Sequence, residues 1–192
     1  MRFTDDDYAE LLGLYLGDGS ISTHPRTHRL RIILDAKYPR IIEDARELLA
    51  RCFPSNDVHL GYYEVVGDCV SLSVYSSHLV CLFPQHGPGP KHERTIALEG
   101  WQRQIVDAAP WAFLRGCIRS DGCVFLNRTG PYEYVSYDFS NASEDITRLF
   151  VDVCEDLRLR PRVTRSDRGL WKVRLNRRES VARLLQHVGV KS

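Results

Sequence analysis

Two short stretches about a hundred residues apart share one pattern, and this doubling limits what the chain can fold into more than any other feature. LLGLYLGDGS begins at Leu11 and LRGCIRSDGC at Leu114, and each passes from an apolar, helix-like segment into Asp-Gly. Small residues recur four positions apart in both copies, which places them on one helix face and lets two backbones approach closely. We therefore expect two helices packed side by side through Gly13 and Gly17 in the first and Gly116 and Ser120 in the second.

The aspartate near the end of each stretch predicts a metal site. If the helices pack in this way, Asp18 and Asp121 emerge at the same end, near one another. A carboxylate at a helix C-terminus faces the negative end of the helix dipole, and a second carboxylate adds repulsion. Such a pair needs a cation. Mg²⁺ suits it, because this ion prefers oxygen ligands and keeps water and phosphate oxygens in its shell.

A single copy of the pattern would be explained more simply as a packed helix that ends in a turn, because Asp-Gly is common in turns. Two copies in the same order, each ahead of a strand-like run, favour the functional interpretation. Through Leu11–Gly19 and Leu114–Gly122 the sequence resembles the LAGLIDADG homing endonucleases. The second copy departs from the family by placing Arg115 and Arg119 where small or acidic residues are common.

Hydrophobic periodicity extends the repeat beyond the motifs. Each half predicts the order helix, hairpin, helix, hairpin, helix, and hence an α+β fold of two pseudo-symmetric αββαββα units at 1–83 and 108–192, joined by a linker at 84–107. Strands are expected at 20–23, 28–35, 58–66, 69–75, 123–126, 134–140, 162–166 and 170–175. Besides the two motif helices, helices are expected over 38–52 and 146–157, in segments that include 101–106 and 181–185, and in a short segment that ends near 83. The halves also close alike, with Gln85-His86 before Lys91 and Gln186-His187 before Lys191.

The resemblance implies an activity as well as a fold. In the family, curved antiparallel sheets form a DNA-binding saddle over the major groove, and a single chain with both motifs acts as a monomer on a long, non-palindromic site in double-stranded DNA. The implied reaction is site-specific, divalent-metal-dependent hydrolysis of a phosphodiester in each strand, which leaves staggered ends.

The resemblance also assigns roles to individual residues. Asp18 and Asp121, helped by the backbone carbonyls of Gly17 and Ser120, are expected to hold Mg²⁺, for which Mn²⁺ or Ca²⁺ can substitute in binding. Lys91 and Lys191 occupy corresponding ends of the two units and are candidates to polarise solvent or stabilise developing charge, although surface lysines in flexible segments explain them equally well. Asp35 and Ser140 are weaker candidates for positioning water.

Charge is unevenly distributed although the formal net charge is only +1. Arg158 to Arg183 holds ten Lys or Arg and two acidic residues, whereas 52–83 holds no Lys or Arg. A charge run is usually a solvated face, so this one gains meaning from the doubled motif. Side chains on alternating strand positions can read base edges, and the candidates for DNA binding are Arg26, Arg29, Arg31, Arg162, Thr164, Arg165, Arg168, Lys172, Arg174 and Asn176.

Other functional classes find little support. Six cysteines without a CxxC pair indicate reduced core residues rather than zinc ligands or disulfides. The sequence contains no nucleotide-binding loop and no nucleophile–histidine pairing that would indicate a small-molecule enzyme. No small-molecule cofactor is therefore expected. The chain has no apolar run of membrane-spanning length, and its N-terminal segment is acidic. These features predict a cytoplasmic protein, nucleoid-associated if bacterial, with no membrane partner. It lacks a terminal His-Asn and is expected to be free-standing rather than an intein.

Two alternatives on the same fold stay open. Some relatives bind DNA as regulators without cutting it and have typically lost the motif carboxylates, which this chain keeps. Others act as RNA maturases that use the same surface for structured RNA.

Overall fold

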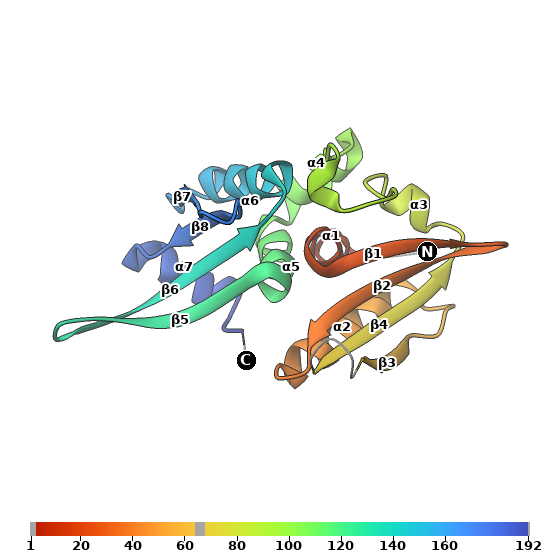
Figure 1. Ribbon diagram of the computed structural model, residues 1–192, viewed down its shortest axis with the longest axis horizontal. Helices are drawn as coiled ribbons and strands as arrows, with labels where there is room; N and C mark the ends of the chain where they lie inside the picture. Colours follow the sequence, from red (N-terminus) through yellow and green to blue (C-terminus); the bar gives the residue numbers. More distant parts are fainter. Residues whose placement is uncertain (1–2, 64–67, 192) are drawn as a thin grey trace.

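The computed structural model describes residues 3–63 and 68–191 and contains two successive αββαββα units (Figure 1). The first unit comprises α1 (Asp5–Asp18), β1 (Gly19–His24), β2 (Thr27–Asp35), α2 (Pro39–Cys52), β3 (His59–Tyr63), β4 (Cys69–Ser76) and α3 (Leu79–Leu82). The connection contains η1 (Lys91–Glu93) and α4 (Gly100–Ala108). The second unit comprises α5 (Pro110–Asp121), β5 (Gly122–Thr129), β6 (Tyr132–Asn141), α6 (Glu144–Asp156), β7 (Arg162–Arg165), β8 (Trp171–Leu175) and α7 (Arg178–His187). The α+β fold class and the element order match the sequence prediction.

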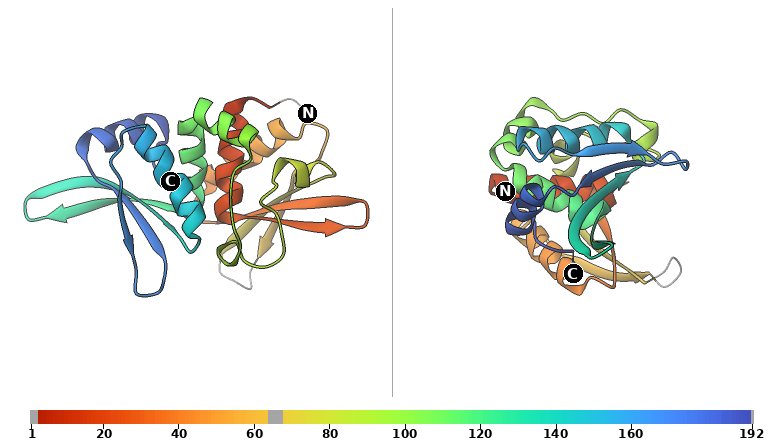
Figure 2. Two further views of the ribbon diagram at one scale, coloured as in Figure 1. Left: turned by 90° about the horizontal axis from the view of Figure 1, so that it is seen from above. Right: turned by 90° about the vertical axis from the view of Figure 1, so that its left-hand side faces the viewer.

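Each unit contains one four-stranded antiparallel sheet, in the order β1-β2-β4-β3 or β5-β6-β8-β7. Alternation within β2 separates two faces, because Leu30, Ile32 and Leu34 are buried against helices while Arg29 and Arg31 point to the opposite face. The two sheets diverge from the central helix pair, and their strands lie on the side away from the outer helices (Figure 2). The uncovered faces therefore form a saddle.

Helices α1 and α5 pack against one another through the small residues that the motifs predicted. A Cβ atom added to Gly116 would lie 2.1 Å from the carbonyl oxygen of Glu10, and one added to Gly13 would lie 2.5 Å from that of Phe113. These distances leave no room for any side chain larger than hydrogen. The close approach is what places both helix C-termini at one point.

The unusual arginines of the second motif stabilise this helix pair. The buried side chain of Glu10 on α1 accepts a hydrogen bond from Arg115 Nε at 2.9 Å and is also paired with Arg119. Arg119 reaches further to Asp44 on α2, at 2.5 Å. The departures from the family pattern thus have their acidic partners on the opposite unit.

Some boundaries differ from the predicted ones. The β5–β6 hairpin extends to 122–129 and 132–141, longer than predicted, because its outer part leaves the core and loses the apolar alternation that marks a half-buried strand. Leu185 lies in the last helix as predicted, but its side chain is exposed although it is apolar. The predicted strand at 58–66 begins at His59, and its end at 64–66 and the turn residue Gly67 lie outside the described residues. Within the described residues, no helix has the length and apolarity that crossing a bilayer requires.

Candidate functional site

The C-termini of α1 and α5 bring two carboxylates together in partly buried positions. Asp18 and Asp121 each end a motif helix, and a Cβ atom added to Gly17 would lie 3.0 Å from Asp121 Oδ2. Burial, together with the neighbouring Asp121 carboxylate, raises the pKa of Asp18 to about 7. Burial also raises the pKa of Asp121, but Asn141 Nδ2 donates a hydrogen bond to Asp121 Oδ2 at 2.6 Å and offsets part of this effect. The pair therefore favours a cation or a proton.

Two lysines supply positive charge at the same point by capping the motif helices. Lys91 Nζ donates to the carbonyl oxygens of Tyr15, Leu16 and Gly17 at 2.5, 2.9 and 3.1 Å. Such a cation at a helix C-terminus is favoured by the dipole. Burial lowers the pKa of Lys91 to about 8, against the opposing influence of the two aspartates.

Lys191 repeats this arrangement on α5. Its Nζ donates to the carbonyl oxygens of Ser120 and Gly122 at 2.6 and 2.9 Å, and burial lowers its pKa. The two carbonyls that the family resemblance suggested as metal ligands, those of Gly17 and Ser120, thus accept hydrogen bonds from lysines in this structure. The carboxylates of Asp18 and Asp121 offer further oxygen atoms beside these carbonyls.

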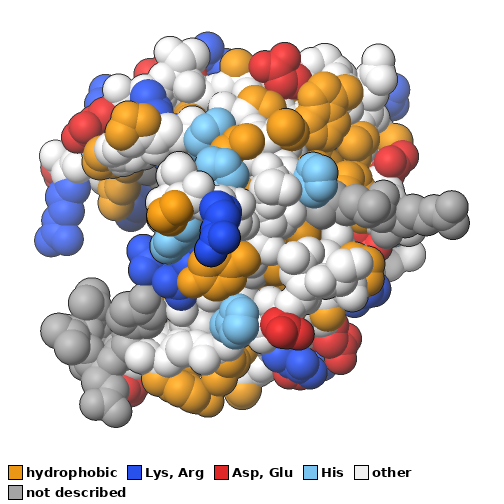
Figure 3. All heavy atoms as spheres, turned by 90° about the vertical axis from the view of Figure 1, so that its right-hand side faces the viewer, with side chains coloured by type: hydrophobic (Ala, Val, Ile, Leu, Met, Phe, Trp, Pro, Cys, Tyr) orange, Lys and Arg blue, Asp and Glu red, His pale blue; other side chains and the backbone are white. Residues whose placement is uncertain are grey.

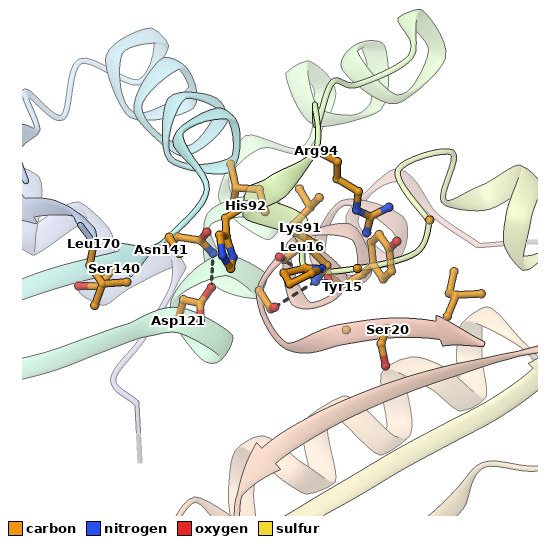
Figure 4. A pocket seen from close by; sticks show the side chains of 18 residues that line it. Tyr15, Leu16, Ser20, Lys91, His92, Arg94, Asp121, Ser140, Asn141 and Leu170 are labelled. Carbon is orange, nitrogen blue, oxygen red and sulfur yellow. Dashed lines mark hydrogen bonds between the residues drawn. The ribbon is translucent and has the colours of Figure 1, made fainter. Parts of the chain in front are cut away.

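Two cavities flank the aspartates, and each combines groups from both units. One, of about 450 Å³, is lined by Asp121 together with Lys91, His92 and Asn141 (Figure 4). The other, of about 630 Å³, is lined by Asp18 together with Lys191. Each cavity therefore pairs the aspartate of one motif helix with the lysine that caps the other motif helix.

Sequence reasoning did not identify Asn141 as part of this site. Asn141 Oδ1 accepts a hydrogen bond from the backbone N–H of Ser143, the N-cap of α6, while its Nδ2 donates to Asp121. Asn141 therefore holds the carboxylate in position. Of the weaker candidates, Ser140 lines the Asp121 cavity, whereas Asp35 lines the Asp18 cavity and is ion-paired with Lys37.

Predicted DNA-binding residues gather on the open face of the second sheet. The register sets Arg162 opposite Arg174 and Thr164 opposite Lys172 across β7 and β8, so all four share that face. Arg165 lies on the other face, with its guanidinium 5.0 Å from the centre of the Trp171 ring. Arg168 belongs to the β7–β8 turn, and Asn176 directly follows β8.

The open face of the first sheet is less charged. Arg29 Nη2 donates to Ser73 Oγ at 3.1 Å, and its guanidinium lies 5.7 Å from the centre of the Tyr75 ring. Arg31 points to the same face, and Arg26 sits in the β1–β2 turn. Viewed from the first unit, Lys and Arg side chains gather where the surface is hollowed, with histidines beside them (Figure 3).

Comparison with known proteins supports the fold. Residues 109–189 match a family model described as a LAGLIDADG-like domain. No curated protein sequence matches the chain significantly. Among solved structures, the N-terminal LAGLIDADG domain of DUF199/WhiA is 15% identical, with a TM-score of 0.64 and coverage of 100% of this chain and 84% of that one.

Two DNA-bound proteins are also similar in structure. I-DmoI in complex with DNA and Mn is 14% identical, with a TM-score of 0.64 over 96% of this chain and 97% of that one. The LAGLIDADG meganuclease I-AabMI bound to uncleaved DNA is 13% identical, with a TM-score of 0.56 over 94% and 82%. At these identities the likeness establishes a common architecture of two units.

Proposed function

We propose that this chain, which has the two-unit LAGLIDADG fold, is a site-specific, divalent-metal-dependent endonuclease of double-stranded DNA. The observation that carries the proposal is the pair of carboxylates at the abutting ends of α1 and α5, each facing a cavity that also holds a lysine. A structure that only bound DNA through its sheets would have no use for two acids buried against one another, which destabilise the fold.

The donor set fits a hard divalent cation. Asp18 and Asp121 offer oxygen ligands, and burial together with the neighbouring Asp121 carboxylate raises the pKa of Asp18 to about 7. Among the described residues no group of three or more His, Cys, Asp or Glu is placed to hold a metal, so the site is not an all-protein cage. Mg²⁺ commonly binds through one or two carboxylates and completes its shell with water and phosphate oxygens. The complex of the similar I-DmoI with DNA and Mn supports this choice.

When bound, the metal makes a water nucleophilic and stabilises the leaving oxyanion. The residues of the chain prepare the site for that chemistry. Asp18 and Asp121 hold the charge, and Asn141 orients the Asp121 carboxylate. Lys91 and Lys191 place positive charge beside the cavities, and this charge attracts a phosphate group.

The two open sheet faces supply the DNA contacts. Because residues at corresponding positions differ between the sheets, we expect the preferred site to be non-palindromic. Its length and its binding by a single chain follow from the resemblance to the family. Staggered cleavage of the two strands follows from the resemblance to the family.

A cleavage selection on a randomised duplex library with Mg²⁺ tests the proposal. We expect the wild type to cut one preferred site, Asp18→Asn and Asp121→Asn to bind that site without cutting it, and Asp107→Asn, an exposed carboxylate on α4, to cut normally. If all four proteins enrich the same uncut duplex, the chain is a DNA-binding protein and not a nuclease. If none enriches any duplex, the DNA proposal is wrong, and structured RNA becomes the substrate to test.

A further inference from the structure

A charged pair on the open face of the second sheet has no part in the catalytic site. Arg174 on β8 donates from Nε to Asp138 Oδ1 at 2.8 Å and from Nη2 to Asp138 Oδ2 at 2.7 Å. Asp138 lies directly opposite on β6, and its side chain is 15% exposed against 47% for Arg174. The guanidinium also lies 5.4 Å from the centre of the Phe125 ring. Arg174 is therefore held in one orientation while its outer end stays accessible.

The donors that remain free on Arg174 suit one particular ligand. A guanidinium has five N–H donors, and the pair with Asp138 uses one on Nε and one on Nη2. One N–H on Nη2 and one on Nη1 are left side by side at the outer end. Two parallel donors with this spacing match O6 and N7 of guanine in the major groove.

The carboxylate beside the guanidinium argues for a base edge and against a phosphate. Asp138 neutralises Arg174 locally and would repel a phosphate that approached the same point. A guanine–cytosine pair offers no such conflict, because the cytosine amino group can donate a hydrogen bond to a carboxylate. Phosphate contacts have better candidates nearby in Arg162 and Lys172, which form no ion pair with any residue in the described part of the chain.

We propose that Arg174, positioned by Asp138, reads a guanine in the half of the DNA site that the second sheet covers. This inference rests on the DNA binding in the proposed function and adds a specificity-determining residue to it.

The residues at the equivalent positions of the first unit, Arg31 and Ser73, are of other types. The strand registers of the two units can be aligned, because Gly19 pairs with Ile32 in the first and Gly122 with Phe139 in the second. In this alignment Arg31 takes the place of Asp138. Ser73, opposite Arg31, takes the place of Arg174, opposite Asp138. The basic residue and the partner that holds it are therefore not repeated. This arginine–aspartate pair is therefore expected to act in one half-site only.

A binding selection on a randomised duplex library without Mg²⁺ tests the inference, with Arg174→Lys, Asp138→Asn and Glu133→Gln compared with the wild type. Lysine keeps the charge of Arg174 but cannot make the parallel two-donor contact. We expect the wild-type site to contain one position with a strong guanine preference, which Arg174→Lys weakens by roughly tenfold or more while other positions keep theirs. Asp138→Asn should relax the same position to a smaller extent.

Glu133→Gln is the matched control. It breaks a 2.7 Å ion pair with Arg128 on the same hairpin, but alternation places that pair on the opposite face of the sheet, so base preferences should not change. A preference lost at one position while the others remain cannot result from unfolding.

Three results would overturn the inference. An unchanged site with Arg174→Lys excludes base reading, and an equal loss of affinity for all sequences identifies a phosphate contact instead. An unchanged position with Asp138→Asn removes the positioning role. Failure of the wild type to enrich any duplex would refute the proposed DNA function itself, which distinguishes that failure from the loss of this inference alone.

Discussion

Asp18 and Asp121 end equivalent helices but have different surroundings. Asn141 donates a hydrogen bond to Asp121, whereas Asp18 receives no such donor from the described part of the chain. The two acids consequently differ in how firmly they are held and in how they retain a proton. Asp18 is one group through which pH acts on the metal-free protein.

Asp18→Asn should stabilise the metal-free protein, and more so at pH 8 than at pH 5. The pKa of Asp18 in the folded protein, about 7, lies above its ordinary value of 3.8. The stability that the protonated carboxyl group allows is therefore fully present below pH 3.8 and is lost as the pH rises through about 7. Asparagine removes this dependence, with an expected gain of roughly 1–4 kcal/mol at pH 8. Urea unfolding in a chelator measures the difference.

Asp107→Asn is the control for this measurement, because Asp107 is exposed and should leave the pH profile unchanged. A loss of stability in Asp18→Asn that is the same at both pH values would show that the carboxylate makes structural contacts rather than carrying an unbalanced charge.

Between elements, the α1–α5 contact tolerates no added atom. Gly116→Ala would place its methyl group against the carbonyl of Glu10, and we expect a loss of about 1–3 kcal/mol, because overpacking at backbone contacts cannot be relieved by side-chain movement. Gly100→Ala is the matched control: Gly100 begins α4, and a Cβ there would meet nothing within 4 Å. Thermal unfolding compares them. Equal melting temperatures would show that the helices can separate at no cost.

Breaking the ion pairs of Glu10 should also weaken the helix contact. In Glu10→Gln the guanidinium groups of Arg115 and Arg119 lose their shared carboxylate, and an expected loss of about 1–3 kcal/mol follows because Glu10 is buried. Glu43→Gln, which breaks an exposed ion pair on α2, should change stability by less than about 1 kcal/mol. Urea unfolding of the two variants makes the comparison. Similar losses in the free energy of unfolding would show that the ion pairs of buried Glu10 stabilise the protein no more than the exposed pair does.

The helix pairing could be predicted from sequence because the spacing of Gly13 and Gly17 and its repeat are local patterns. The partners of Arg115 and Arg119 could not, because Glu10 and Asp44 lie on distant segments and nothing in the second motif refers to them. The same holds for Asn141, which lies 20 residues from Asp121 in the sequence and contacts it only in the fold. Periodicity identifies the face on which Arg174 lies, but its pairing with Asp138 depends on strand register.

At the scale of the whole molecule, the open face of the second sheet carries two cations, Arg162 and Lys172, that form no ion pair among the described residues. Since each phosphate neutralised releases counterions, the salt dependence of DNA affinity counts such contacts. Phosphate contacts are therefore expected from Arg162 and Lys172.

The double variant Arg162→Ala/Lys172→Ala should reduce the slope of log affinity against log salt by roughly 2 in magnitude, because each phosphate contact contributes about 0.9 to that slope. Arg46→Ala, which removes an exposed charge on α2 on the far side of the first sheet, should leave the slope unchanged while lowering net charge in the same direction. Titrations of the selected duplex across a salt series separate the two. An equal decrease per charge removed in both proteins would mean that total charge rather than the open face of the second sheet governs binding, whereas a decrease confined to the double variant would place two phosphate contacts on β7 and β8.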